Sequence, residues 1–200
     1  RRPVYRASHT SKEEIMADHP VVLVDNDDRR RSRLTTFFRY LLVIPHIIYL
    51  YLWMIAASVV MIINWFATLI MGTPPEGLHG FLSRYLRYST HVSVYLNLLA
   101  NPYPGFSSSD AYPVTLELPP AEKQNRLVTF FRFLLAIPAF ILTAILNWLL
   151  GILGFISWFV CLILGRMPDG LEKLGLTCMR FQVRTMAYTM LITARYPSVD

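Results

Sequence analysis

Residues 32–46 read SRLTTFFRYLLVIPH and residues 125–139 read NRLVTFFRFLLAIPA. The two stretches match at an offset of 93 residues, the separation of Arg33 from Arg126, and the match continues without a gap. Further pairs at this offset are Trp65-Phe66 with Trp158-Phe159, Gly72 with Gly165, Pro75 with Pro168, Arg87 with Arg180, Tyr95 with Tyr188, and Tyr103-Pro104 with Tyr196-Pro197. Self-similarity at a fixed period indicates a repeated structural unit. The sequence therefore predicts two tandem copies of one unit.

Long uncharged stretches follow each of these openings. Residues 40–75 and 133–165 contain no Asp, Glu, Lys or Arg, and all 19 Lys and Arg residues lie outside them. Charged residues make up 16% of the 200 residues and hydrophobic residues 54%, whereas soluble domains carry about 25% charged residues. This pattern excludes a soluble enzyme domain, a disordered chain and a nucleic-acid module, and it predicts an integral membrane protein. The net charge of +6 suits anionic lipid headgroups.

Each copy has the same order of parts. A short alternating segment opens it, at residues 20–24 and 113–118, and is typical of a short strand or an extended arm. The uncharged block comes next, and a Gly-x-x-Pro-x-Gly-Leu break ends it. An amphipathic segment with a basic stripe follows, as expected for a helix lying in a membrane interface. We divide the chain into a polar N-terminal arm (1–19), a first membrane repeat (20–107) and a second membrane repeat (108–200).

The uncharged blocks are too long for one straight membrane crossing. A helix of 36 residues is about 54 Å long, against a hydrocarbon core of about 30 Å. One interpretation is a hairpin that turns near Trp53-Met54 in the first copy and at 147–151 in the second. It keeps every Lys and Arg on the cytoplasmic side and relates the repeats by an axis along the membrane normal. The other is a single span with an interfacial lead-in, broken near Pro45 and Pro138. We expect an all-α membrane protein with short β segments, in which each repeat is an apolar helical hairpin followed by an amphipathic interfacial helix.

Basic residues at the borders of the blocks and on the amphipathic helices are the candidate site residues. The set is Arg33, Arg39, Arg87, Arg126, Arg132, Arg180 and Arg184. Arginine binds phosphate groups with two hydrogen bonds and extends its charge out of apolar surroundings. The pattern predicts two equivalent sites for anionic lipid headgroups. Topology-setting charge without a defined site, or ion pairs with Glu76 and Asp169, would give the same pattern.

Catalytic and metal-binding patterns are missing from the sequence. It contains neither a phosphate-binding glycine loop nor a Cys/His zinc spacing. His46 and His91 are candidate haem ligands, but the second copy has Ala139 and Arg184 at these positions. We therefore predict a protein that is not an enzyme and holds no cofactor or metal.

The matched motifs resemble a known family. The run Ser32 to His46, Trp65-Phe66-Ala67, Gly72 to Leu78 and Tyr103-Pro104 is similar to the family called domain of unknown function 4389. That family consists of bacterial integral membrane proteins without a known activity. The resemblance covers nearly the whole chain, in two tandem copies. It implies a multi-pass protein of the bacterial inner membrane, and the charge distribution predicts cytoplasmic termini.

These observations favour a structural or accessory subunit of a membrane assembly, which binds anionic lipid headgroups and organises or curves the membrane. Its expected partners are membrane lipids and either further copies of itself or a larger membrane complex, and not nucleic acid. One alternative is a small oligomeric channel or transporter with Ser58, Asn64, Thr68 and Asn147 as its polar groups. Another is a redox accessory subunit that holds haem.

Overall fold

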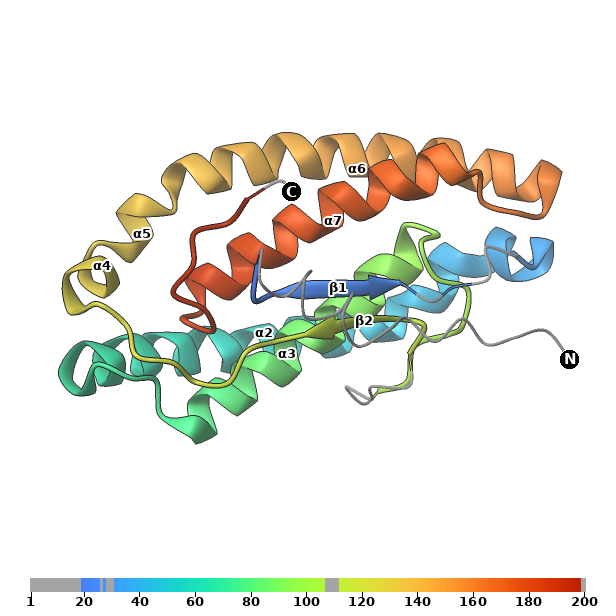
Figure 1. Cartoon of the computed structure of the whole chain (residues 1–200). Helices are drawn as coiled ribbons and strands as arrows, with labels where there is room; N and C mark the ends of the chain where they lie inside the picture. The colour runs from blue at the N-terminus through green and yellow to red at the C-terminus, as the bar shows by residue number, and fades with distance from the viewer. Residues whose placement is uncertain (1–18, 26, 28–30, 107–111, 199–200) are drawn as a thin grey trace, which may run out of the picture.

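The computed structural model describes residues 19–25, 27, 31–106 and 112–198, and it has the duplicated organisation expected (Figure 1). The first repeat consists of strand β1 (Val22–Asp25) and helices α2 (Arg33–Met71) and α3 (Glu76–Leu96). The second consists of strand β2 (Val114–Glu117) and helices α4 (Arg126–Phe130), α5 (Arg132–Leu135), α6 (Ile137–Leu164) and α7 (Asp169–Thr189). The described chain is thus mostly helical, with one short sheet.

The uncharged blocks form long helices, so the hairpins predicted inside them are wrong. Helix α2 continues through Trp53-Met54, and α6 continues through residues 147–151. Neither site contains proline, and a glycine such as Gly151 weakens a helix by only about 1 kcal/mol. The chain turns instead at the Gly-x-x-Pro breaks. Gly72 and Gly165 end the helices with φ angles of 82° and 70°, a left-handed conformation that glycine adopts without a steric penalty.

The hairpin of each repeat is formed by the long helix and the amphipathic helix after it. Helix α3 packs along α2, and α7 packs along α6. Both amphipathic helices begin directly after a proline and carry an acidic residue, Glu76 or Asp169, in the first turn, where the helix dipole favours negative charge.

The two prolines of the openings behave differently. Pro45 lies inside α2, which is not broken there. In the second repeat the chain breaks twice, at Phe131 and at Ala136, and Pro138 lies in the first turn of α6, where a missing N–H is tolerated. The predicted break near the proline is therefore found in the second repeat and is absent from the first.

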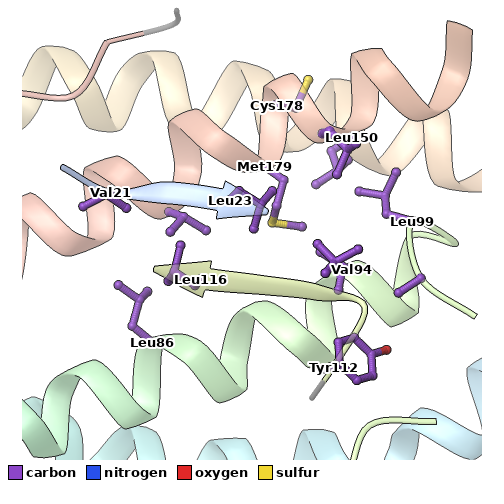
Figure 2. Close-up of a cluster of buried hydrophobic side chains, with 14 of the residues drawn as sticks. Val21, Leu23, Leu86, Val94, Leu99, Tyr112, Leu116, Leu150, Cys178 and Met179 are labelled. Atoms are coloured by element: carbon purple, nitrogen blue, oxygen red, sulfur yellow. The ribbon is translucent and has the colours of Figure 1, made fainter. Parts of the chain in front are cut away.

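The predicted strands of the two repeats pair with each other. β1 and β2 form an antiparallel two-stranded sheet in which Val22 lies opposite Glu117 and Asp25 lies opposite Val114. Each strand turns part of its apolar side chains toward the helices, and Figure 2 shows Val21, Leu23 and Leu116 in the buried cluster. The sheet therefore joins the repeats through their backbones.

One hydrophobic core is shared by both repeats. It includes Leu86 and Leu99 from the first repeat, Leu150 and Met179 from the second, and the strand residues (Figure 2). Figure 1 shows α6 along one long edge of the molecule with α7 beside it, α3 crossing α2 on the other side, and the strands between α7 and α3. This arrangement leaves much of the surface of α2 and α6 without protein contacts.

Candidate membrane-facing surface and paired arginine sites

Helix α2 is polar on its buried side and apolar on its exposed side. The polar residues in its buried stripe are Thr36, Arg39, His46, Asn64 and Thr68. Its exposed large side chains include Leu34 (71% exposed), Ile55 (52%) and Ile70 (73%). Water would favour the opposite distribution, because exposed apolar patches of this extent are rare in soluble proteins. The outer face of α2 is therefore suited to lipid.

Helix α6 and the segment before it repeat this pattern at the 93-residue offset. Thr129, Arg132, Thr143 and Ser157 are buried, and the outer face carries exposed Ile, Phe, Leu and Trp side chains. Both α2 and α6 are long and apolar enough to cross a membrane, by length and composition.

Arg39 and Arg132 are fully buried and hold the ends of the amphipathic helices. The Nη1 of Arg39 donates to the carbonyls of Tyr95 (2.6 Å) and Ala100 (3.0 Å). Its guanidinium lies 4.2 Å from the centre of the Tyr95 ring, which adds a cation–π attraction. The first repeat thus uses a buried charge to satisfy carbonyls that a helix end leaves without partners.

The second repeat contains the same anchor. The Nη1 of Arg132 donates to the carbonyls of Tyr188 (2.6 Å) and Thr193 (2.9 Å), and its Nη2 donates to Oε1 of Gln124 (2.6 Å). The distance from its guanidinium to the Tyr188 ring centre is again 4.2 Å. For Arg39 and Arg132 the headgroup prediction is therefore wrong, because both are at most 1% exposed and donate to the protein itself.

Arg33 and Arg126 connect the two repeats at their ends. The Nη2 of Arg33 donates to the carbonyl of Ile163 at the end of α6, at 2.9 Å. The Nη2 of Arg126 donates to the carbonyl of Ile70 at the end of α2, also at 2.9 Å. Both arginines are exposed, and a cation at a helix C-terminus is stabilising. These two residues remain able to contact a headgroup with their other N–H groups.

Two tryptophans make a second reciprocal connection. The indole N–H of Trp65 donates to the carbonyl of Thr129 (2.8 Å), and that of Trp158 donates to the carbonyl of Thr36 (2.9 Å). The start of each long segment therefore lies beside the end of the other. Helices α2 and α6 run antiparallel, so an approximate two-fold axis perpendicular to them relates the repeats.

The arginines on the amphipathic helices differ in exposure. Arg184 is 6% exposed and donates to the carbonyls of Val21 (3.4 Å) and Ser198 (3.0 Å), so for this residue too the headgroup prediction is wrong. Arg87 is half-buried and donates to the carbonyl of Leu116 (3.2 Å). Arg180 is half-exposed.

Sequence reasoning missed a further pair of anchors. Arg31 donates from Nε and Nη2 to the carbonyl of Leu98, at 3.0 and 2.8 Å, and its side chain also pairs with Asp27. At the 93-residue offset, Gln124 donates to the carbonyl of Leu191 at 3.4 Å. Leu98 and Leu191 have φ angles of 61° and 63°, which are unusual outside glycine. The sequence contains one signal for these anchors: Leu98 and Leu191 stand at matched positions, one just after each amphipathic helix.

The two histidines considered for haem have different partners. Nδ1 of His46 lies 2.7 Å from the hydroxyl of Tyr88, and its ring stacks on Phe106. The ring of His91 stacks on Tyr112, with 4.6 Å between ring centres. Among the residues that the structure describes, no group of three or more His, Cys, Asp or Glu side chains could hold a metal ion.

The four polar groups proposed for a channel do not lie along one path. Asn64 and Thr68 are buried, and Nδ2 of Asn64 donates to the carbonyl of Met190 at 3.2 Å. Ser58 is exposed and donates to the carbonyl of Met54, and Asn147 is exposed on α6.

The fold and its contacts define a duplicated helical protein with two long, lipid-suited helices and paired arginine anchors. The comparison with protein families agrees with the duplication. The chain belongs to the family described as Domain of unknown function (DUF4389), whose profile matches residues 33–108 and 126–199. One matched region falls on the helices of each repeat and begins after its strand, so the predicted family and the predicted duplication are confirmed. Neither the curated proteins nor the solved structures include a match to this chain.

Proposed function

We propose that this protein is a non-enzymatic membrane-shaping or accessory subunit that lies in the plane of the bacterial inner membrane, within one leaflet, and gathers anionic lipids. The supporting observation is that the buried sides of α2 and α6 carry polar side chains such as Arg39, Asn64 and Thr143, whereas large apolar side chains are exposed along both helices.

The length of α2 favours an in-plane position. Its 39 residues correspond to about 58 Å, which is nearly twice the thickness of the hydrocarbon core. A straight transmembrane helix of this length would have to tilt by about 60° to keep its apolar surface in lipid, far beyond the usual 0–40°. A helix lying parallel to the membrane has no such mismatch.

The sheet supports the same placement. Figure 1 shows β1 and β2 alongside the middle of the long helices, so helices crossing the bilayer would place the strands near its centre. The two-stranded sheet has no further strand on its outer edges in the described part of the chain, and Asp25 and Glu117 belong to it. Open sheet edges do not occur in contact with lipid tails, because nothing there can satisfy the backbone. We therefore place the sheet on the aqueous, cytoplasmic side.

The approximate two-fold axis is consistent with an in-plane position. It makes the two ends of the molecule equivalent, with exposed Arg33 and Arg166 at one end and exposed Arg126 and Lys123 at the other. In a transmembrane orientation, equal positive charge on the two sides would give no preferred direction. In an in-plane orientation the axis is the membrane normal, and both ends lie in the same headgroup layer. This placement differs from the multi-pass arrangement expected from the sequence.

Exposed basic residues of the amphipathic helices supply the headgroup contacts in this proposal. Arg84 and Lys173 are exposed and Arg180 is half-exposed, whereas Arg39, Arg132 and Arg184 serve the protein interior. A basic residue close to an anionic surface contributes about 1 kcal/mol to binding. Two helices inserted into one leaflet also widen that leaflet relative to the other, which bends the membrane.

Reconstitution tests this proposal with labelled lipids. The measurement is energy transfer from protein tryptophan to dansyl-phosphatidylglycerol or dansyl-phosphatidylcholine in mixed vesicles. We expect several-fold enrichment of phosphatidylglycerol near the protein, a loss of this enrichment in Arg84→Gln/Lys173→Gln/Arg180→Gln, and its retention in the charge-preserving control Arg84→Lys/Lys173→Arg/Arg180→Lys. Vesicle diameter by electron cryomicroscopy should fall as the protein-to-lipid ratio rises. Equal transfer to both lipids by the wild type would disprove headgroup binding, and unchanged vesicle diameter would disprove membrane shaping.

A further inference from the structure

The outer face of α6 carries a hollow that the fold itself does not use. It is open to the surroundings and has a volume of about 470 Å³, and the described residues that line it are Asn147, Trp148, Gly151, Ile152 and Phe155. A Cβ atom added at Gly151 would meet nothing within 4 Å. The glycine is therefore not required by packing inside the molecule, and an alanine or leucine there would favour the helix.

Two polar groups beside the hollow have no partner in the described structure. Asn147 is exposed and Trp148 is 78% exposed, and neither side chain makes a hydrogen bond to another described residue. By contrast, the indole groups of Trp65 and Trp158 both donate to carbonyls. An unpaired carboxamide in contact with lipid tails costs several kcal/mol, so a partner that satisfies it is strongly favoured.

The first repeat lacks these features at the matched positions. The residues equivalent to Asn147, Trp148 and Gly151 are Met54, Ile55 and Ser58. The hydroxyl of Ser58 is satisfied by the carbonyl of Met54 at 2.8 Å. The fold therefore tolerates an ordinary lipid-facing surface here, and of the two repeats only the second has the combination of Asn147, Trp148 and Gly151.

We propose that α6 pairs with α6 of a second copy of this chain, in antiparallel orientation, with Trp148 of each copy in the hollow at Gly151 of the other. The proposal rests on the proposed in-plane position of α6, which supplies the apolar surroundings. Trp148 and Gly151 lie about one turn apart on the same face of α6. A two-fold axis between these two residues therefore places Trp148 of each copy against Gly151 of the other, which makes the interface self-complementary.

The chemistry of Asn147 also favours a copy of the same chain. A carboxamide is both donor and acceptor, so it can pair with the same group or with the indole N–H of Trp148 across a two-fold axis. Small residues allow close approach of helices in membranes, and polar side chains add hydrogen bonds between them. For proteins lying in one leaflet, a two-fold axis along the membrane normal requires the two α6 helices to be antiparallel.

Energy transfer between donor- and acceptor-labelled protein in vesicles tests the pairing. For the wild type we expect energy transfer that rises with protein density. For Gly151→Leu we expect the association constant to fall at least tenfold, because the leucine side chain fills the hollow without disturbing the monomer. Asn147→Leu should weaken association about three- to tenfold. The matched control is Ser58→Leu, the equivalent exposed position of α2, which should associate like the wild type.

The spacing between spin labels distinguishes the orientation. Labels at Ile163, an exposed residue near the end of α6, should lie about 40 Å apart along the helix direction in an antiparallel pair centred between residues 148 and 151. Labels less than 20 Å apart would indicate a parallel pair and overturn the proposal, as would a monomeric wild type or equal loss in Ser58→Leu. Vesicle partition of each variant is measured in parallel, so that failure of membrane embedding is distinguished from failure of pairing.

Discussion

Replacement of Arg132 by glutamine tests whether this arginine stabilises the fold or binds lipid headgroups. The change removes a buried charge that donates to the carbonyls of Tyr188 and Thr193 and to the Gln124 side chain. Hydrogen bonds to charged groups contribute about 1.5–3 kcal/mol each. Glutamine retains one such contact at most, and the carbonyls left behind are buried. We therefore expect a loss of about 3–5 kcal/mol in the free energy of unfolding, in the range seen when buried charged networks are broken.

Thermal unfolding in detergent, followed by tryptophan fluorescence, measures this loss. One kcal/mol lowers Tm by about 2–4 °C for a chain of this size, so Arg132→Gln should unfold about 10 °C lower than the wild type. The control Arg180→Gln removes a half-exposed arginine, and surface changes of this kind alter stability by no more than about 0.5 kcal/mol. In vesicles the folded fraction of Arg132→Gln should keep its phosphatidylglycerol enrichment. An unchanged Tm together with lost enrichment would refute the anchor role and restore the headgroup role for Arg132.

Three further outcomes are expected. Asp27→Ala removes the carboxylate that pairs with the buried guanidinium of Arg31 and should lower stability by about 2 kcal/mol in the same assay, whereas an unchanged Tm would mean that the pair does not contribute. Trp158→Phe removes the indole donor to the Thr36 carbonyl and should lower stability by about 1 kcal/mol while keeping the ring contacts, and a Tm drop above 10 °C would contradict this. Burial, followed by the nearby arginines, lowers the pKa of His19 to about 4, so the unfolded chain takes up a proton below pH 6.5 that the native chain does not. Stability should fall by up to about 3 kcal/mol between pH 6.5 and pH 4, and a His19→Gln variant with the same pH profile would contradict this.

The duplication and the element types could be predicted because they depend on local patterns. The same offset of 93 residues relates contacts in the structure that the sequence pattern did not predict. The contact of Arg39 with the Tyr95 ring, for example, is repeated by Arg132 and Tyr188. The short strands also followed from alternation after a proline. Their pairing across the repeats did not, because strand pairing over such a separation depends on the tertiary arrangement.

The hairpins inside the uncharged blocks were inferred from length rather than from a turn signal. Trp53-Met54 has the local composition of a helix, and the structure keeps it helical. The excess length is accommodated because α2 extends along the whole molecule. The roles of Arg39 and Arg132 could not be predicted either. A basic residue at the edge of an apolar block gives the same sequence pattern whether its side chain contacts a phosphate group or the end of a neighbouring helix.

The depth of α2 along its length tests the central claim most directly. Spin labels are introduced by Leu34→Cys, Ile55→Cys and Ile70→Cys, one at a time, in a background with Cys161→Ser and Cys178→Ala. All three native side chains are more than half exposed, and collision with oxygen and with a water-soluble nickel complex reports the depth of each label in vesicles. The in-plane position predicts the same depth, within one leaflet, for all three labels. A label at Ile55 near the bilayer centre, with Leu34 and Ile70 in the headgroup layers of opposite leaflets, would contradict it.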